Sequence, residues 1–312
     1  MRPVFIVGCP RSGSTMLGAM LGGHPEAICP PEAQFIIDCM PASNLSAAVD
    51  VDAVLDDIKR HWRFRVWPFN LESRPSAAEA ANMSYRNVIE WVVAQYAIAH
   101  QRPAPKVWID QSILVRHIWK LLQLFPDARF IHLVRDGRAV AASIIPLDWG
   151  PKGVLSAARH WIEHLAHGFA AEATLGADRI IRVHYERVLA EPEATMKRIS
   201  SFLGIEFYSA MLVPAGLALP EHTRHQHTLI GAPLDSKRID AWRQSLTKRE
   251  IEIYEAVAGD LLPLLGYEMS SDRARPPSRV EAIRLTLMEW LVRFSDRVRL
   301  AFRRQNWMQR SG

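Results

Sequence analysis

The residues with the clearest chemical potential stand at the start of the chain. The apolar run Val4–Val7 is followed at once by the loop Gly8–Thr15, and apolar residues at helical spacing follow over Met16–Leu21. A strand, a glycine-bounded loop and a helix N-terminus direct backbone N–H groups and the positive end of the helix dipole toward one point. The segment therefore predicts an anion-binding site.

The two loop glycines have the G-x4-G spacing of a phosphate-binding loop, but Ser14 stands where nucleotide triphosphatases have lysine. That lysine spans the β- and γ-phosphates of a nucleotide triphosphate. Its replacement argues against ATP or GTP and favours a ligand with one phosphate-like group at this place. The alternative is a purely structural role, with Ser14 as the N-cap of the following helix.

Composition indicates a globular chain that uses reduced cysteines. The 312 residues are 49% hydrophobic and 23% charged, and no run of 18 apolar residues occurs. Met1-Arg2-Pro3 leads directly into the first apolar run, which is not the pattern of a secretory signal. Cys9, Cys29 and Cys39 lack metal-site spacing. We therefore expect a cytoplasmic protein without a disulfide framework or a metal site.

The net charge of +5 is concentrated in the C-terminal tail. Residues 271–312 contain ten Arg, two Asp and two Glu, a net charge of +6, so residues 1–270 sum to −1. A nucleic-acid-binding role would need a basic face on the fold itself. The distribution therefore predicts no nucleic-acid partner.

Short apolar runs alternate with helical patterns along residues 1–270. This alternation predicts an α/β fold with a P-loop-type parallel sheet flanked by helices. In such sheets the ligand lies beyond the carboxyl ends of the strands. We expect strands at Val4–Val7, Ala27–Cys29, Val107–Asp110, Arg129–Val134 and Arg179–His184, and helices at Glu32–Met40, Leu45–Trp62, Ala77–His100, Ile113–Phe125, Gly137–Ile145, Gly153–Leu175, Pro192–Leu203 and Lys248–Leu265.

The tail forms a separate element. Pro276-Pro277 marks a break, and between Val280 and Phe302 apolar residues recur every three or four positions with Arg on the other face. This pattern predicts a basic amphipathic helix over 276–312, beside a domain over 1–270. Such a helix either packs on the body or on a second subunit of a homodimer, or it lies peripherally on an anionic membrane.

Two segments together resemble the sulfotransferases that use 3′-phosphoadenosine 5′-phosphosulfate (PAPS). Pro10–Thr15 resembles their 5′-phosphosulfate loop, and Leu124–Ser143 resembles their 3′-phosphate segment. Further similarity appears at Tyr185–Gly204 and Ser236–Trp242, and the pattern is closest to the tyrosylprotein and bacterial branch. The resemblance covers residues 1–268 and implies transfer of a sulfuryl group to an acceptor hydroxyl by in-line displacement, without a metal.

The resemblance also implies which residues bind the donor. The 5′-phosphate would be held by Arg11, Ser12, Gly13, Ser14 and Thr15. The 3′-phosphate would be held by Arg135 and by Ser143, eight residues later. Tyr185 and Arg238 are further candidates, and Lys237 lies beside the latter.

Glu32, just past the second expected strand, corresponds to the general base of the tyrosylprotein branch. Its structural alternative is a helix N-terminal Glu favoured by the dipole. One position departs from the family: Gln111 stands where many relatives carry a lysine that supports the transferring group. Either Arg11 or another cation compensates, or turnover is slow, or the chain binds a nucleotide at a membrane surface without catalysis. A P-loop small-molecule kinase is a further alternative.

Several histidines invite a metal interpretation that their spacing does not support. His222, His225 and His227 have no nearby Cys, so a polar loop lining an acceptor cleft is the better interpretation. His132 lies within an expected strand and is predicted to be a core histidine. The acceptor is not identified by any motif.

Overall fold

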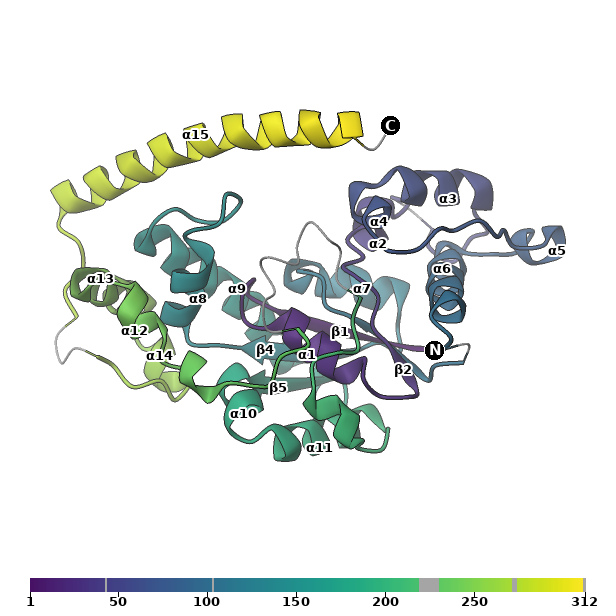
Figure 1. Ribbon diagram of the computed structural model, residues 1–312, viewed down its shortest axis with the longest axis horizontal. Coiled ribbons are helices and arrows are strands. Elements are labelled where there is room, and N and C mark those ends of the chain that lie inside the picture. The colour runs from purple at the N-terminus through teal and green to yellow at the C-terminus, as the bar shows by residue number, and fades with distance from the viewer. Residues whose placement is uncertain (43, 103, 219–229, 271–273, 311–312) are drawn as a thin grey trace. The chain divides into compact units, whose positions relative to one another are not determined.

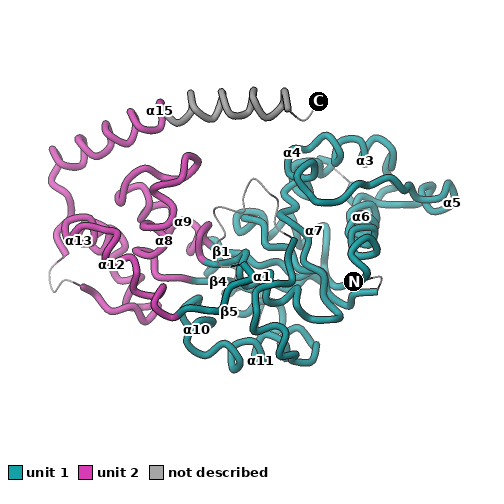
Figure 2. The backbone as a smooth tube through the Cα atoms, in the orientation of Figure 1, with its two compact units in different colours: residues 1–8, 13–134, 167–235 teal, residues 9–12, 135–166, 236–312 magenta. Residues whose placement is uncertain are grey.

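The computed structural model describes residues 1–42, 44–102, 104–218, 230–270 and 274–310, with side chains described as far as 295 (Figure 1). The described chain divides into two compact units (Figure 2). Unit 1 comprises residues 1–8, 13–134 and 167–235, and unit 2 comprises residues 9–12, 135–166 and 236–312. Within the described residues, no helix has both the length and the apolar character needed to cross a bilayer.

Unit 1 contains a five-stranded parallel sheet of order β2-β3-β1-β4-β5. β1 is central and pairs with β3 through Val4 and Ile109 and with β4 through Ile6 and Ile131. Parallel neighbours need crossover connections, which the intervening helices supply. All five predicted strands are confirmed, as β1 (Arg2–Gly8), β2 (Ala27–Ile28), β3 (Val107–Asp110), β4 (Arg129–Val134) and β5 (Ile180–His184).

The strands are continuous apolar runs because the sheet is buried on both faces. Phe5 on β1 is at the centre of an aromatic core, 5.7 Å from the ring of Phe130 and 5.9 Å from those of Trp108 and Phe125. Each of these four rings is at most 1% exposed. Burial of such rings contributes about 2–3 kcal/mol per side chain, so this cluster fixes where the strand ends lie.

Several helices of unit 1 are shorter and more interrupted than the sequence pattern predicts, whereas the helix expected over Pro192–Leu203 is confirmed with those bounds. The helices are α1 (Ser14–Leu21), α2 (Phe35–Asp38), α3 (Val51–Arg60), α4 (Trp62–Arg65), α5 (Ala77–Ala80), α6 (Tyr85–Ala99), α7 (Ile118–Leu124), α10 (Tyr185–Ala190) and α11 (Pro192–Leu203), with 3-10 turns η1 (Val115–His117) and η2 (Ser209–Leu212).

Side-chain caps explain two of these differences. The helix expected from Leu45 begins only at Val51, because the Asp50 carboxylate accepts a hydrogen bond from the N–H of Ala53. The helix expected over Ala77–His100 is divided, because Ser84 and Asn87 form a capping box that starts α6. Each cap satisfies backbone donors that a continuous helix would bond internally.

Unit 2 consists of helices together with the four-residue segment Cys9–Ser12. Its elements are α8 (Gly137–Ile144), the first part of α9 (Val154–Leu175), η4 (Ser236–Arg238), α12 (Trp242–Ser245), α13 (Lys248–Ala258), α14 (Leu261–Leu264) and α15 (Arg279–Arg310). The single helix expected over Lys248–Leu265 is wrong: it ends at Gly259, whose φ of 56° is left-handed. Glycine adopts that conformation at little cost and terminates α13.

The expected tail helix is present as α15, the yellow helix of Figure 1. Its first turn is held to α13 by the ion pair between Arg249 and Glu281, 2.6 Å. Most large apolar side chains of its described part are exposed, from 45% at Val292 to 78% at Val280, while Leu285 is half-buried. Described residues therefore leave this apolar face uncovered.

Candidate functional site

Arg11 has an unusual backbone conformation at the centre of the predicted anion-binding loop. Its φ of 72° is left-handed, which costs a non-glycine residue roughly 1–2 kcal/mol. The strained geometry is held from both sides: the Arg11 carbonyl accepts a hydrogen bond from Arg135 Nη1 at 3.0 Å, and Arg11 Nε donates to Ser143 Oγ at 3.1 Å. Three residues predicted to bind the donor therefore lie together in unit 2.

The guanidinium groups of Arg11 and Arg135 and the hydroxyl of Ser143 are together suited to binding a multiply charged anion. Bringing like charges together is unfavourable, and a bound phosphate offsets that repulsion with charge-assisted hydrogen bonds. Ser12 adds a second hydroxyl, whose buried Oγ has no hydrogen-bond partner among the described residues. A buried hydroxyl without a partner costs about 1–3 kcal/mol, so a phosphate oxygen fits this position.

The position of Arg135 is fixed by the start of α8. Trp161 Nε1 on α9 donates to the Arg135 carbonyl at 3.1 Å. Asp136 is the N-cap of α8, accepting from the N–H of Arg138 at 2.9 Å. These two hydrogen bonds orient the turn that carries Arg135, while α8 carries Ser143 two turns later.

A buried ion cluster anchors this turn to α13. Arg138 is 2% exposed and pairs with Asp136 at 2.8 Å and with Glu255 at 2.5 Å, while its guanidinium lies 4.2 Å from the ring centre of Trp242. Burial lowers the pKa of Arg138, but its two carboxylate partners raise it overall. Arg138 and Glu255 are positioning residues that our sequence analysis missed. The Asp136 cap could have been found from its place before a helix, whereas Glu255 carries no local signal.

In unit 1, the loop continues at Gly13, where only glycine fits. Its φ is 99°, and a Cβ atom there would lie 2.5 Å from Cδ2 of Tyr185. Tyr185, the first residue of α10, is buried against this turn. Gly13 is the N-cap of α1 and Ser14 its first residue, so the alternative of Ser14 as N-cap is wrong.

Thr15 contacts the position that departs from the family pattern. Its Oγ1 donates to Gln111 Oε1 at 3.1 Å, and both side chains are buried. This bond uses the amide oxygen of Gln111, so its NH2 group is the part of the side chain that could donate a hydrogen bond to a ligand. Gln111 follows β3 directly, so it lies at the carboxyl end of the sheet.

Asp110 connects that sheet edge to the segment carrying Glu32. Its carboxylate accepts from the N–H of Ser112 at 2.8 Å and from Ser112 Oγ at 3.1 Å, and Ser112 Oγ accepts from the N–H of Ala33 at 2.7 Å. Complete burial raises the pKa of Asp110 to about 6, although the hydrogen bonds from Ser112 oppose that rise and the charge of Glu32 adds to it.

Glu32 is held by an ion pair rather than by a helix. Its Oε2 lies 2.7 Å from Arg63 Nη1, and its carbonyl accepts from Trp67 Nε1 at 3.2 Å. Because α2 starts only at Phe35, the alternative of a helix N-terminal Glu is wrong. The carboxylate is 22% exposed, so it remains accessible to a reacting group.

The remaining predicted residues have different outcomes. Arg238 and Lys237 are exposed on η4, and their contact with a phosphate stays a prediction. His222, His225 and His227 lie outside the described residues. The prediction for His132 is confirmed: it is fully buried, 2.6 Å from Glu172.

Comparison with known proteins gives consistent results. A model of the sulfotransferase family matches residues 3–209. The protein-tyrosine sulfotransferase of Drosophila melanogaster is 26% identical over 290 residues, which cover 88% of this chain and 52% of that protein. The nodulation protein NoeE of Sinorhizobium fredii is 26% identical over 310 residues, which cover 89% of this chain and 68% of that protein. The chain thus spans about half the length of the Drosophila relative.

Solved structures agree on the fold. The sulfotransferase domain of the Synechococcus PCC 7002 olefin synthase gives a TM-score of 0.59 at 24% identity, covering 86% of this chain and 95% of that domain. The sulfotransferase domain from the curacin biosynthetic pathway gives a TM-score of 0.57 at 20% identity, covering 86% and 99%. The predicted α/β fold with a P-loop-type parallel sheet is thereby confirmed.

Proposed function

The chain belongs to the sulfotransferase family, and from that premise we propose that it transfers a sulfuryl group from PAPS to an acceptor hydroxyl by in-line displacement. The observation that carries the proposal is the group formed by Arg11, Arg135 and Ser143. Arg135 and the Ser143 hydroxyl suit the phosphate monoester dianion that PAPS has at its 3′ position and ATP lacks, and Arg11 beside them suits the 5′-phosphate. Bound there, PAPS would supply an activated sulfuryl group and a phosphate leaving group.

The residues of the chain then have separate tasks. Arg135 and Ser143 bind the 3′-phosphate, and Arg11 and the Ser12 hydroxyl stabilise the charge that accumulates on the 5′-phosphate. Ser14, Thr15 and the N–H groups at the start of α1 contribute to the same stabilisation. Gln111 donates a hydrogen bond through its NH2 group where many relatives have a cation. Tyr185 packs on Gly13 and keeps the loop in its left-handed turn.

Glu32 is the base in this proposal. Its carboxylate removes the proton of the acceptor hydroxyl, while Arg63 holds the carboxylate in place. General-base catalysis contributes about 10²–10⁴-fold, which sets the expected effect of removing it. The acceptor is defined here only by its hydroxyl group.

The test is turnover of sulfur-labelled PAPS with extracts and with hydroxyl acceptors of several classes. We expect labelled product with the wild type and at least about a 100-fold loss with Glu32→Gln. Glu90→Gln is the matched control, since Glu90 is also partly buried and paired with an arginine in unit 1. Binding without turnover would support the non-catalytic alternative, and consumption of ATP without PAPS would support a kinase.

We also propose that α15 lies on an anionic membrane surface. An exposed apolar face, together with the +6 charge of residues 271–312, fits the interface of a bilayer carrying anionic lipid. The intact chain should sediment with vesicles containing phosphatidylserine but not with purely zwitterionic vesicles. A chain ending at residue 275 should remain in the supernatant. Concentration-dependent dimerisation without sedimentation would instead assign this face to a second copy of the chain.

A further inference from the structure

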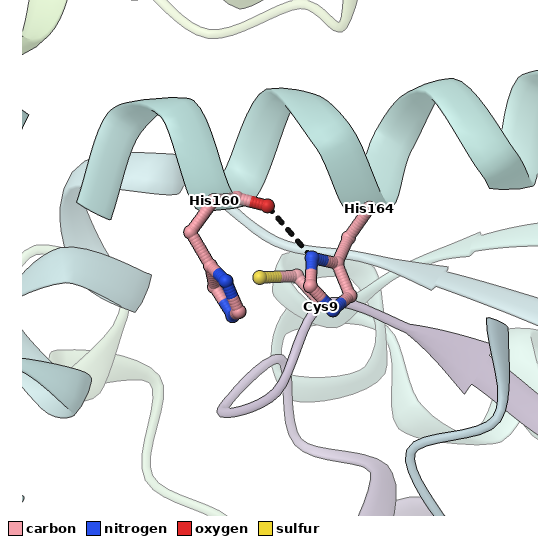
Figure 3. A group of neighbouring side chains, drawn as sticks. All are labelled: Cys9, His160 and His164. Carbon is pink, nitrogen blue, oxygen red and sulfur yellow. Dashed lines mark hydrogen bonds between the residues drawn. The ribbon is translucent and has the colours of Figure 1, made fainter. Parts of the chain in front are cut away.

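Three potential metal ligands from distant parts of the sequence meet in unit 2. Cys9 follows β1 directly, and His160 and His164 lie on α9. Their ligand atoms all lie within 4.8 Å of one another (Figure 3). We propose that Cys9, His160 and His164 form a binding site for a zinc-like divalent transition metal ion.

The two histidines have the spacing that places both rings on one side of a helix. Residues i and i+4 are neighbours on a helix surface, and in Figure 3 both rings project from α9 toward Cys9. Their ring centres are 4.1 Å apart. Tetrahedral zinc, with bonds of about 2.3 Å to sulfur and 2.0–2.1 Å to nitrogen, requires separations of roughly 3.3–3.6 Å between ligand atoms. Side-chain rotations that close the cluster by about 1 Å would satisfy that geometry.

The hydrogen bond of His164 selects the correct nitrogen. Its Nδ1 lies 2.7 Å from the carbonyl oxygen of His160, and because a carbonyl only accepts, Nδ1 must carry the proton. In the neutral ring, Nε2 is then the unprotonated nitrogen, and it is the atom that would coordinate a metal. Bonding the second ring nitrogen to a backbone carbonyl is the usual way in which proteins orient a ligating histidine.

The donor atoms determine the class of ion. One thiolate and two imidazole nitrogens favour zinc and related late transition metals, whereas magnesium and calcium require oxygen ligands. Binding breaks the S–H bond of Cys9 and releases its proton to solvent, while both histidines bind as neutral rings. Three protein ligands leave a fourth position for water.

Coordination at this site would attach the phosphate-binding segment to α9. Cys9 begins the segment Cys9–Ser12, and the N–H of Ser12 already bonds to the Cys9 carbonyl at 3.2 Å. Trp161 lies between the two histidines in sequence and holds the Arg135 carbonyl. The ion therefore has a positioning role and takes no part in the chemical step.

The test uses the full chain, stripped with a chelator and titrated with Co²⁺ as a spectroscopic substitute for Zn²⁺. We expect one Co²⁺ per chain, a thiolate-to-cobalt charge-transfer band, and loss of that band when Zn²⁺ is added. Cys9→Ser should abolish the band, and His160→Gln, which alters the least buried ligand, should weaken binding at least about tenfold. Zn²⁺ should raise the melting temperature of the wild type and leave that of Cys9→Ser unchanged.

Two control variants make the outcome specific. Cys39→Ser removes another thiol, and replacement of His222, His225 and His227 by Gln removes three histidines that lie close together in the sequence. Both should retain the charge-transfer band. The proposal is overturned if the band persists in folded Cys9→Ser, if it disappears in either control, or if the wild type binds neither Co²⁺ nor Zn²⁺. Circular dichroism establishes that each variant is folded.

Discussion

Replacement of Arg135 by alanine should selectively reduce affinity for nucleotides with a 3′-phosphate. Arg135 Nη1 bonds to the Arg11 carbonyl, so its guanidinium is already positioned before a ligand binds. A hydrogen bond to a charged group contributes about 1.5–3 kcal/mol, which corresponds to roughly 10- to 150-fold in affinity. Arg135→Ala should weaken binding of adenosine 3′,5′-bisphosphate by that factor.

Ser143→Ala provides a graded comparison for the same site. A neutral hydroxyl contributes about 0.5–1.5 kcal/mol, or roughly 2- to 12-fold, so its loss should be the smaller one. The variant also removes the acceptor of Arg11 Nε. Arg159→Ala is the matched control, since Arg159 is exposed on α9 in the same unit.

Isothermal titration with two ligands separates the contributions. Adenosine 5′-monophosphate lacks the 3′-phosphate, so Arg135→Ala should affect its binding much less than that of the bisphosphate. The reasoning fails if the wild type binds both ligands equally, or if Arg135→Ala weakens both by the same factor. The second result would mean that Arg135 acts only through the shape of the loop.

Two further predictions concern buried charges. Glu255→Gln should lower the free energy of unfolding by about 3–5 kcal/mol in urea titrations, because it leaves Arg138 buried with one anionic partner fewer. The control Glu191→Gln removes a partner from an exposed ion pair and should lower the free energy of unfolding by less than about 1 kcal/mol. Equal losses in the two variants would contradict the prediction. Asp110 should destabilise the folded state as pH rises from about 4 to 6, because its folded pKa is raised from 3.8 to about 6 and the buried group must ionise. The free energy of unfolding of Asp110→Asn should therefore rise by up to ~3 kcal/mol relative to that of the wild type over that pH range, as measured by thermal or urea unfolding. If the difference in free energy of unfolding between the two proteins does not change with pH, the raised pKa of Asp110 is refuted.

The sheet could be predicted from the sequence because its signal is local. Runs such as Val4–Val7 and Val107–Ile109 are apolar without alternation, which is the signature of strands buried on both faces. Once the strands are placed, topology requires that the residues following them lie at one sheet edge. The contact of Thr15 with Gln111 follows that expectation.

The helix boundaries were harder to predict because capping overrides apolar periodicity. Ser84 and Gly259 each interrupt a pattern that reads as one long helix. Serine is a common helix N-cap and glycine a common helix C-cap, so the sequence contained both signals. The apolar periodicity on either side of each residue nevertheless favoured one continuous helix. Glu32 differs, since it lies outside α2 and its partner Arg63 is on another element, which no local signal indicates.

The sequence could not indicate which residues contact one another when they lie far apart in the chain. Arg138 and Glu255 are 117 positions apart, and nothing near either residue specifies the other. In the cluster of Cys9, His160 and His164, only the two histidines have a local metal-site spacing, and Cys9 joins them from a loop distant in the chain. Such pairs depend on how the helices pack, which is a property of the folded chain.

The segment Cys9–Ser12 links the proposed donor site with the proposed metal site. Its Arg11 carries the contacts to Arg135 and Ser143, and its Cys9 carries the thiol of the proposed metal site. A four-residue segment with a strained residue at its centre has few ways to adjust one end without the other. If metal binding changes affinity for the bisphosphate by some factor, linkage requires that the bisphosphate change affinity for the metal by the same factor. A factor clearly different from one therefore shows that the two sites are coupled, and a factor of one would refute transmission of binding through this segment.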